Sequence, residues 1–245
     1  MPVAGRLLGS GRTADVYEID EAWVLRRDRE GRGDAVAEAA VMAHVRAHGY
    51  PAPAVRPPVS RADLVMERLD GPTMLQALTA LTALTALTAL TALTALTALT
   101  AGALDAGEAG EMLARLLRAL HAVPGRVSDG ARVLHLDLHP DNVVLVPDGP
   151  RVIDRTNAED GHPGLDWGTS AVILAQVAVC AEPVAAPARP PLARAMPTAL
   201  LADPSDLTEE GLAQALRRRA ANPTMSPRET ELLPSAAESI RSLAV

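Results

Sequence analysis

Three oxygen-bearing side chains lie close together in the stretch HLDLHPDNVVLVPDGPRVID, residues 135–154. They belong to Asp137, Asn142 and Asp154. Carboxylate and amide oxygens are the ligands that Mg²⁺ prefers, and protein-bound Mg²⁺ usually keeps positions open for phosphate oxygens. The turn residues PDGP predict a hairpin that folds Asp154 back toward Asn142. The stretch therefore indicates a Mg²⁺ and phosphate site. A polar loop in which Asp and Asn only form turns is the alternative.

The spacing of His135, Asp137 and Asn142 adds a more specific signal. The pattern H-x-D-x-x-x-x-N matches the catalytic loop of kinases. The fuller stretch HLDLHPDN, followed by VIDRTNAEDGHPGLDW, resembles the aminoglycoside phosphotransferase family of small-molecule kinases. The resemblance implies an α+β, protein-kinase-like fold of two lobes. We expect a small β-rich N-lobe at about residues 1–69 and a larger helical C-lobe at about 70–245.

The same resemblance implies a role for each polar residue of the stretch. Asp137 would be the catalytic residue, the base that accepts or orients the proton of the substrate hydroxyl. Asn142 and Asp154 would bind the Mg²⁺ that bridges the nucleotide phosphates. Asp166 would be a buried aspartate that braces the catalytic loop from the next helix, and His135 would pack within the loop. These roles suit phosphoryl transfer, which needs charge neutralisation and positioning more than covalent help.

The beginning of the chain is expected to hold the nucleotide. In LLGSGRTADVYEI, the glycines of a hairpin would let backbone amides approach phosphate groups. Taken alone, the same glycines also fit an ordinary hairpin turn. At this position of a kinase-like chain, the resemblance implies that ATP or GTP binds at Gly9, Ser10 and Gly11, and that Val16 packs on the base.

A second part of the expected nucleotide site lies further along the N-lobe. A protein kinase carries a lysine on the third strand, whereas this chain has no lysine and carries Arg26 in the stretch WVLRR. The resemblance implies that Arg26 contacts phosphate and pairs with Glu38. The alternative is one exposed charge on a strand and another on a helix. In VMERLDG, Glu67 and Leu69 would meet the adenine edge through backbone groups.

The predicted secondary structure positions these residues on two different kinds of element. Residues 1–28 alternate apolar and polar positions with glycines between them, which predicts a three-stranded meander. Helical signals cover residues 34–50 and 107–123, and residues 63–71 have the pattern of a strand that enters a linker. From about residue 166 the chain is mostly helical. A strand-rich part followed by a helix-rich part predicts two lobes.

Residues 77–100 are eight copies of the triplet Ala-Leu-Thr. The length would suffice for a membrane-spanning helix. A third of the residues are threonine and the flanks carry no basic cluster or aromatic belt, so we expect no membrane partner. Successive leucines rotate by about 60° around an α-helix, and no face stays apolar. We expect a helical arm or two shorter helices, which serve either homo-oligomer formation or no function at all as a passive insertion.

Composition restricts the classes of partner and compartment. The formal net charge is -7, which argues against nucleic acid as a partner. Hydrophobic residues make up 48% of the chain, as in ordinary globular proteins. The single cysteine, Cys180, suits a reducing compartment, and the first residues contain no apolar signal-peptide core. We therefore expect a cytoplasmic protein.

Two features depart from the family or from protein kinases. Arg155 stands where the family usually has an aromatic residue, and its guanidinium could compete for the carboxylate of Asp154 or reach the substrate or phosphate. Only eleven residues separate Asp154 from Asp166, too few for the activation segment with which a protein kinase docks a peptide. The short segment favours a small-molecule acceptor over a protein acceptor.

We therefore expect transfer of the γ-phosphate of ATP or GTP to a hydroxyl of a small molecule, aminoglycoside-like or related. The carboxy-terminal helices that we expect to select the acceptor carry acidic residues (Glu159, Asp160 and Glu182). These acids are compatible with an amine-bearing acceptor, although acids at the surface are more often only solvated. The alternative is a catalytically weak nucleotide-binding module for regulation or interaction, with the repeat as its self-association surface.

Overall fold

The computed structural model describes residues 4–244 with the exception of residues 12, 32, 59, 81–103, 182–188 and 205. The chain divides into two compact units. The first comprises Met1–Gly71 and Val144–Ala158, and the second comprises Pro72–Val143 and Glu159–Val245. Strands dominate the first unit and helices the second, which confirms the α+β class. The segment that carries Asp154 packs with the strand-rich unit, and the expected lobe boundary near residue 69 stays a prediction.

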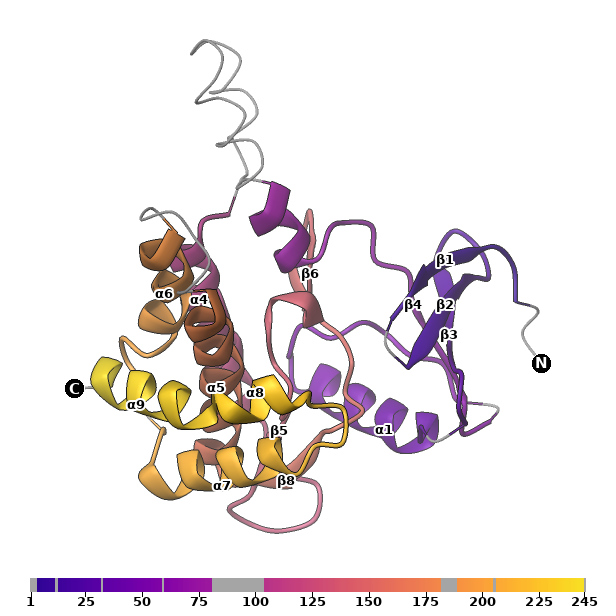
Figure 1. The fold of residues 1–245 in the computed structure, drawn as a ribbon. Helices are drawn as coiled ribbons and strands as arrows, with labels where there is room; N and C mark the ends of the chain where they lie inside the picture. Colours follow the sequence, from indigo (N-terminus) through magenta and orange to yellow (C-terminus); the bar gives the residue numbers. More distant parts are fainter. Residues whose placement is uncertain are drawn as a thin grey trace, which may run out of the picture. The chain divides into compact units, whose positions relative to one another are not determined.

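The first unit contains a four-stranded antiparallel sheet with neighbouring strands in chain order (Figure 1). Its strands are β1 (Leu7–Ser10), β2 (Ala14–Glu18), β3 (Trp23–Asp28) and β4 (Asp63–Glu67). The first three form the meander that the alternating pattern predicts. Arg26 lies at the centre of the sheet, opposite Val16 on one neighbouring strand and Leu64 on the other.

Helix α1 (Ala35–Ala47) packs against this sheet. It begins at Asp34, whose carboxylate accepts the Ala37 N–H at 3.1 Å and so satisfies one unpaired donor of the first turn. Ala39 and Met42 of the helix are buried in one apolar cluster with Leu64 of β4. This packing fixes the rotation of α1 about its axis and therefore the direction of its polar side chains.

The hairpin predicted from PDGP is present and, apart from its first residue, belongs to the first unit. Its strands are β6 (Val143–Val146) and β7 (Gly149–Val152). Gly149 has a φ of 106°, a left-handed conformation that glycine adopts without steric cost. Asp154 follows β7 after one further residue.

The second unit is built from helices and one small sheet. Besides the helical residues 74–80, the α-helices among its described residues are α4 (Ala106–His121), α5 (Pro163–Ala181), α6 (Arg189–Leu200), α7 (Glu209–Ala220), α8 (Pro227–Glu231) and α9 (Leu233–Leu243). Helix α5 contacts α6, α7 and α9 (Figure 1). It approaches α7 so closely that a Cβ on Gly211 would lie 2.4 Å from the carbonyl of Gly164. Glycine is therefore needed where these backbones meet.

Two features of the second unit lie outside the sequence-based expectations. Strands β5 (Arg132–Leu134) and β8 (Glu159–Gly161) form an antiparallel pair that no local pattern indicates. A 3₁₀ helix, η1 (Pro140–Asn142), follows the expected catalytic loop. The sheet holds the start of that loop at the end of β5.

The Ala-Leu-Thr repeat is described only at its beginning. Residues 74–80 are helical, and residues 81–100, with the expected arm, lie outside the described residues. In the part of the chain that the structure describes, no helix combines the length and the apolar character needed to cross a membrane.

Candidate active site

The hairpin between β1 and β2 carries Gly9, Ser10 and Gly11. The Ser10 hydroxyl donates a hydrogen bond to Asp15 Oδ1 at 2.7 Å, and the Gly11 N–H donates to the Ala14 carbonyl at 2.8 Å. Arg29 donates to the Gly11 carbonyl. A Cβ on Gly9 would meet no atom within 4 Å, so space is open beside its backbone. Polar contacts thus hold the turn while its glycine surface stays accessible.

Arg26 and Glu38 form the expected ion pair within the first unit. Arg26 Nη2 contacts Glu38 Oε2, and Glu38 Oε1 accepts the backbone N–H of Arg155 at 3.1 Å. The Glu38 side chain is only 3% exposed and that of Arg26 19%. Burial raises the pKa of Glu38, and the positive charge of Arg26 opposes this rise. The alternative of two exposed charges is therefore wrong.

Asp154 joins this pair to form a charge cluster. Arg26 Nη1 lies 3.4 Å from Asp154 Oδ1 and 3.4 Å from Thr156 Oγ1. The Thr156 hydroxyl donates to Asp154 Oδ1 at 2.6 Å. The Arg26 guanidinium thus contacts two carboxylates, that of Glu38 on α1 and that of Asp154 after β7. Sequence analysis predicted Arg26, Glu38 and Asp154 but missed Thr156, for which proximity to Asp154 in the chain was the only signal.

Arg155 does not make the contact that its position in the sequence indicated. Its side chain is buried, with the residue 1% exposed, and its guanidinium lies over the Tyr50 ring at 4.7 Å from the centroid. All three guanidinium nitrogens lack a hydrogen-bond partner among the residues that the structure describes. The competing contact with the Asp154 carboxylate comes from Arg26 instead.

Replacement of Arg155 by methionine is expected to raise the free energy of unfolding by about 1–4 kcal/mol, because it exchanges a buried charge without hydrogen bonds for an apolar side chain of similar length. Urea denaturation at neutral pH measures the change. Arg155→Lys, which keeps a charge but loses the planar group over Tyr50, is the control and should not stabilise the protein. A clear loss of stability in Arg155→Met would mean that the guanidinium offsets the buried charge of Glu38. Arg155→Trp should leave nucleotide-dependent activity intact.

The two residues expected to contact adenine, Glu67 and Leu69, lie at the end of β4 and just after it. The N–H of Glu67, at the end of β4, donates to the Ala54 carbonyl at 2.8 Å, and Glu67 Oε2 accepts the Ala54 N–H at 2.9 Å. The Glu67 N–H is thus engaged within the unit. Adenine recognition by the carbonyl of Glu67 and the backbone of Leu69 stays a prediction, as does packing of Val16 on the base.

The expected catalytic loop lies in the second unit and is held by Asp166 of α5. The Asp166 carboxylate is fully buried and accepts the N–H of His135 at 2.8 Å and that of Leu136 at 2.7 Å. His121 of α4 contacts the same carboxylate through Nε2 at 3.0 Å. The expectation that Asp166 braces the loop is confirmed. His121 was missed, although its position four residues after Leu117 marks the buried face of its helix.

Competing influences set the pKa of Asp166. Burial alone would raise it, but the hydrogen bond and charge of His121, together with the charge and backbone N–H of His135, outweigh burial and hold it below its usual range. The carboxylate also fixes Leu136, whose φ of 61° is unusual for a residue with a bulky side chain. This backbone conformation leads directly into Asp137.

Asp137 and Asn142 meet at the end of the loop. Asn142 Nδ2 donates to the backbone carbonyl of Asp137 at 2.9 Å, so the amide oxygen is the side-chain atom that could bind a metal ion. The Asp137 carboxylate is 30% exposed and lies 3.8 Å from His139 Nε2. Asn142 is buried, with the residue 8% exposed. The Asn142 amide thus fixes the backbone of Asp137, whose carboxylate is accessible.

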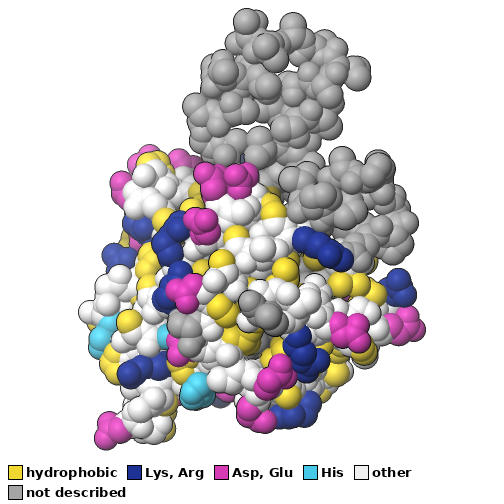
Figure 2. Space-filling view, turned by 90° about the vertical axis from the view of Figure 1, so that its left-hand side faces the viewer, with side chains coloured by type: hydrophobic (Ala, Val, Ile, Leu, Met, Phe, Trp, Pro, Cys, Tyr) yellow, Lys and Arg dark blue, Asp and Glu magenta, His cyan; other side chains and the backbone are white. Residues whose placement is uncertain are grey.

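Two of the three acids that might have selected an amine-bearing acceptor are used within the fold. Glu159 and Asp160 belong to β8, not to a helix. Glu159 pairs with Arg218 at 2.8 Å, and Asp160 accepts Arg126 Nε at 3.0 Å and the Val127 N–H at 2.9 Å. Glu182 lies outside the described residues. On the face shown in Figure 2, acidic and basic side chains are interspersed and neither sign gathers in one area.

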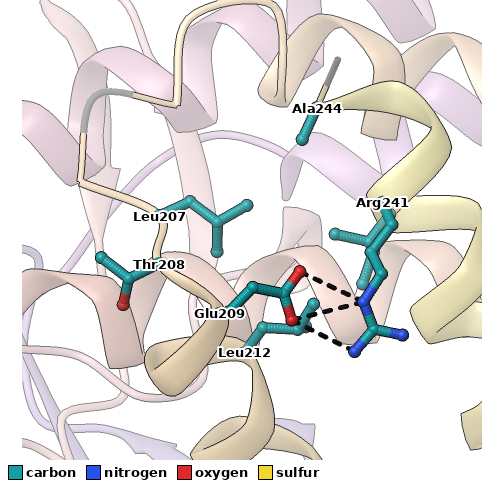
Figure 3. Close-up of a pocket in the computed structure, with 7 residues that line it drawn as sticks. Leu207, Thr208, Glu209, Leu212, Arg241 and Ala244 are labelled. Carbon is teal, nitrogen blue, oxygen red and sulfur yellow. Dashed lines mark hydrogen bonds and ion pairs between the residues drawn. The ribbon is translucent and has the colours of Figure 1, made fainter.

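A surface pocket of about 130 Å³ lies between α7 and α9 of the second unit (Figure 3). Glu209 and Arg241 point toward one another on its wall and form a forked ion pair, with Arg241 Nε 3.1 Å from Oε1 and Nη2 3.2 Å from Oε2. The remaining lining residues are Leu207, Thr208, Leu212, Ile240 and Ala244. None of the predicted site residues lines this pocket, so we do not assign it to the candidate site.

Comparison with solved structures identifies the class of fold. The gentamicin complex of APH(2'')-IIa matches with a TM-score of 0.53 at 11% identity, over 98% of this chain and 93% of that chain. The choline kinase LicA from Streptococcus pneumoniae gives 0.53 at 10% identity, again over 98% and 93%. ADP-bound APH(2'')-Ib gives 0.50 at 13% identity, over 96% and 93%. The fold is that of small-molecule kinases of the aminoglycoside phosphotransferase type.

The sequence also carries the family signature directly. The model of the phosphotransferase enzyme family (APH) matches residues 4–133, more than half of the chain. The chain belongs to this family. The match ends before His135, so it does not include the catalytic loop or Asp154. None of the curated proteins matches the chain significantly.

Proposed function

We propose that the protein transfers the γ-phosphate of ATP or GTP to a hydroxyl group of a small molecule. The observation that carries this proposal is the charge cluster in which Arg26 contacts both Glu38 and Asp154. A cation held by a buried acid and set beside a second carboxylate suits the binding of nucleotide phosphates and their metal ion. The ADP-bound state of APH(2'')-Ib, which has the same fold, supports nucleotide binding.

The donor chemistry of two residues fits Mg²⁺. Asp154 offers a carboxylate, and Asn142 offers an amide oxygen because its amide nitrogen is bonded to the loop. Among the described residues, no group of three or more His, Cys, Asp and Glu side chains could hold a metal alone. This suits Mg²⁺, which is usually bound by one or two protein oxygens together with substrate phosphates and water. When bound, the ion would neutralise charge on the phosphates.

The remaining roles follow from the geometry within each unit. Asp137 would accept the proton of the acceptor hydroxyl, because its carboxylate is accessible and its backbone is fixed by Asn142. Backbone amides at Gly9, Ser10 and Gly11 would approach the phosphates from the β1–β2 turn. Arg26 would contact phosphate as a fork instead of the point charge that lysine provides.

The acceptor is proposed to be a small molecule, aminoglycoside-like or related. The short segment between Asp154 and Asp166 contains β8, which pairs with β5, so its residues are already used in the fold. The gentamicin complex and the choline kinase among the structural neighbours support an amine-bearing acceptor. The alternative of a catalytically weak module drew on Arg155 and on the repeat. The Arg155 guanidinium contacts Tyr50 instead of Asp154, and residues 81–100 of the repeat lie outside the described residues. The joint presence of Asp137, Asn142 and Asp154 favours the enzyme. We therefore keep the enzyme as the proposed function.

Thermal-shift measurements with Mg-ATP and Mg-GTP test nucleotide binding. At a nucleotide concentration of about 100 times the Kd, binding should add about 2.7 kcal/mol to the free energy of unfolding. Arg26→Ala should abolish the shift. Arg61→Ala, which removes an exposed arginine paired with Asp34 at 2.6 Å in the same unit, should preserve it. If neither Mg-ATP nor Mg-GTP shifts the melting temperature, the proposal is refuted. A screen of hydroxyl compounds for ADP or GDP release then identifies the acceptor.

A further inference from the structure

Thr156 connects two charged groups of the first unit through a neutral hydroxyl. Its Oγ1 donates to Asp154 Oδ1 at 2.6 Å and accepts from Arg26 Nη1 at 3.4 Å. A hydroxyl has one proton to donate and two lone pairs, so it makes both contacts at once. The backbone N–H of Thr156 also donates to Asp154 Oδ1 at 3.4 Å. Asp154 Oδ1 thus accepts hydrogen bonds from both Arg26 and Thr156.

The backbone of Asp154 depends on such local support. Its φ of 58° is left-handed, a conformation that residues with a side chain rarely adopt. Asp tolerates it when the carboxylate binds backbone or side-chain donors two residues further on, as it does here at Thr156. The adjoining residue is also fixed, because the Arg155 N–H donates to Glu38 and the Arg155 carbonyl accepts the Ala158 N–H at 3.1 Å.

We infer that Thr156 is a positioning residue, whose hydroxyl orients the Asp154 carboxylate and couples it to Arg26. This inference rests on the proposed function, in which Asp154 binds the metal ion and Arg26 binds phosphate. Without the hydroxyl, Arg26 Nη1, which lies 3.4 Å from Asp154 Oδ1, still donates to that oxygen and no longer shares its protons with Thr156. The ion pair between Arg26 and Asp154 would tighten. Arg26 would then offer less positive charge to the phosphates, and Asp154 would offer less negative charge to the metal ion.

The side chain allows a clean substitution. Thr156 is exposed, so loss of its hydroxyl should not disturb the apolar core. Thr156→Val keeps the shape of the side chain and removes the hydroxyl, whereas Thr156→Ser keeps the hydroxyl and removes a methyl group. Thr198→Val makes the same chemical change on α6, where the hydroxyl donates only to the Arg194 carbonyl at 2.7 Å. It is the matched control.

The experiment is a Mg²⁺ titration of the full-length protein at a fixed ATP concentration, followed by thermal denaturation. The measured quantity is the Mg²⁺ concentration at half of the nucleotide-dependent stabilisation. Thr156→Val should raise this concentration about tenfold or more, as loss of partners behind metal ligands commonly does. Thr156→Ser and Thr198→Val should stay close to the wild type, and circular dichroism verifies that every variant is folded.

Each outcome separates this inference from the proposed function. If Thr156→Val titrates like the wild type while Asp154→Ala loses its Mg²⁺ response, the inference is overturned and the proposed function stands. If Thr156→Ser needs as high a Mg²⁺ concentration as Thr156→Val, loss of the hydroxyl is not the cause and the inference is again overturned. A normal Mg²⁺ response in Asp154→Ala would refute the proposed metal ligand. A wild-type protein with no response to Mg-ATP or Mg-GTP would overturn both.

Discussion

Asp137→Asn is expected to lower the rate of phosphoryl transfer by about 10²–10⁴-fold while nucleotide binding stays at the wild-type level. The amide cannot accept the proton of the acceptor hydroxyl. The loop should keep its conformation, because Asn142 donates to the backbone carbonyl of Asp137 and not to its side chain. The substituted side chain is also partly exposed, so it carries little of the packing.

Turnover on an identified acceptor and thermal shift with Mg-ATP or Mg-GTP together measure this effect. Asp141→Asn is the matched control, since Asp141 lies in η1 and its carboxylate accepts only the Thr73 hydroxyl among the contacts described, at 3.0 Å. It should retain activity. Asp154→Ala differs from both, because it should weaken Mg-nucleotide binding itself. Full turnover by Asp137→Asn would show that another group accepts the proton.

Sequence signals were sufficient where the chemistry is local or strongly patterned. The alternation of residues 1–28 gave the meander, and PDGP gave the hairpin of β6 and β7. The pairing of Arg26 with Glu38 and the bracing by Asp166 came from the family resemblance, and the structure contains both. The pairing of β5 with β8 could not be predicted, because two three-residue strands carry almost no pattern and lie far apart in the chain.

Proximity in the sequence is a poor guide to side-chain contacts where the backbone turns, as it does at Asp154. Because Arg155 and Asp154 are neighbours in sequence, competition of Arg155 for the Asp154 carboxylate was one of two expectations, and contact with substrate or phosphate was the other. Asp154 has a left-handed backbone, and the Arg155 side chain is directed to the Tyr50 ring. The guanidinium that reaches Asp154 comes from Arg26 on β3, which only the fold brings there. His121 was missed because its partner Asp166 lies 45 residues further along the chain, and the contact of Thr156 with Arg26 was missed because only the fold brings them together.

Asp166→Ala is expected to lower the free energy of unfolding by about 3–5 kcal/mol, the usual effect of removing one partner from a buried charged pair. Three donors lose their acceptor: His121 Nε2 and the backbone N–H groups of His135 and Leu136. Each buried donor without a partner costs about 1–3 kcal/mol. The left-handed Leu136 also loses the contact that holds it. Asp203→Ala, at a side chain 79% exposed, is the control and should change stability by less than about 0.5 kcal/mol.

The pH dependence of this difference distinguishes the charged carboxylate from a purely structural role. Because the pKa of Asp166 is lowered in the folded state, its ionised form stabilises the fold. That contribution is fully present above the ordinary carboxyl pKa and is lost as the pH falls through the lowered value. In urea denaturation, the stability difference between wild type and Asp166→Ala should therefore persist from neutral pH down to about pH 4 and be lost only in stronger acid. A gap that already closes between pH 7 and pH 5 would mean that a different group supplies the stabilising charge.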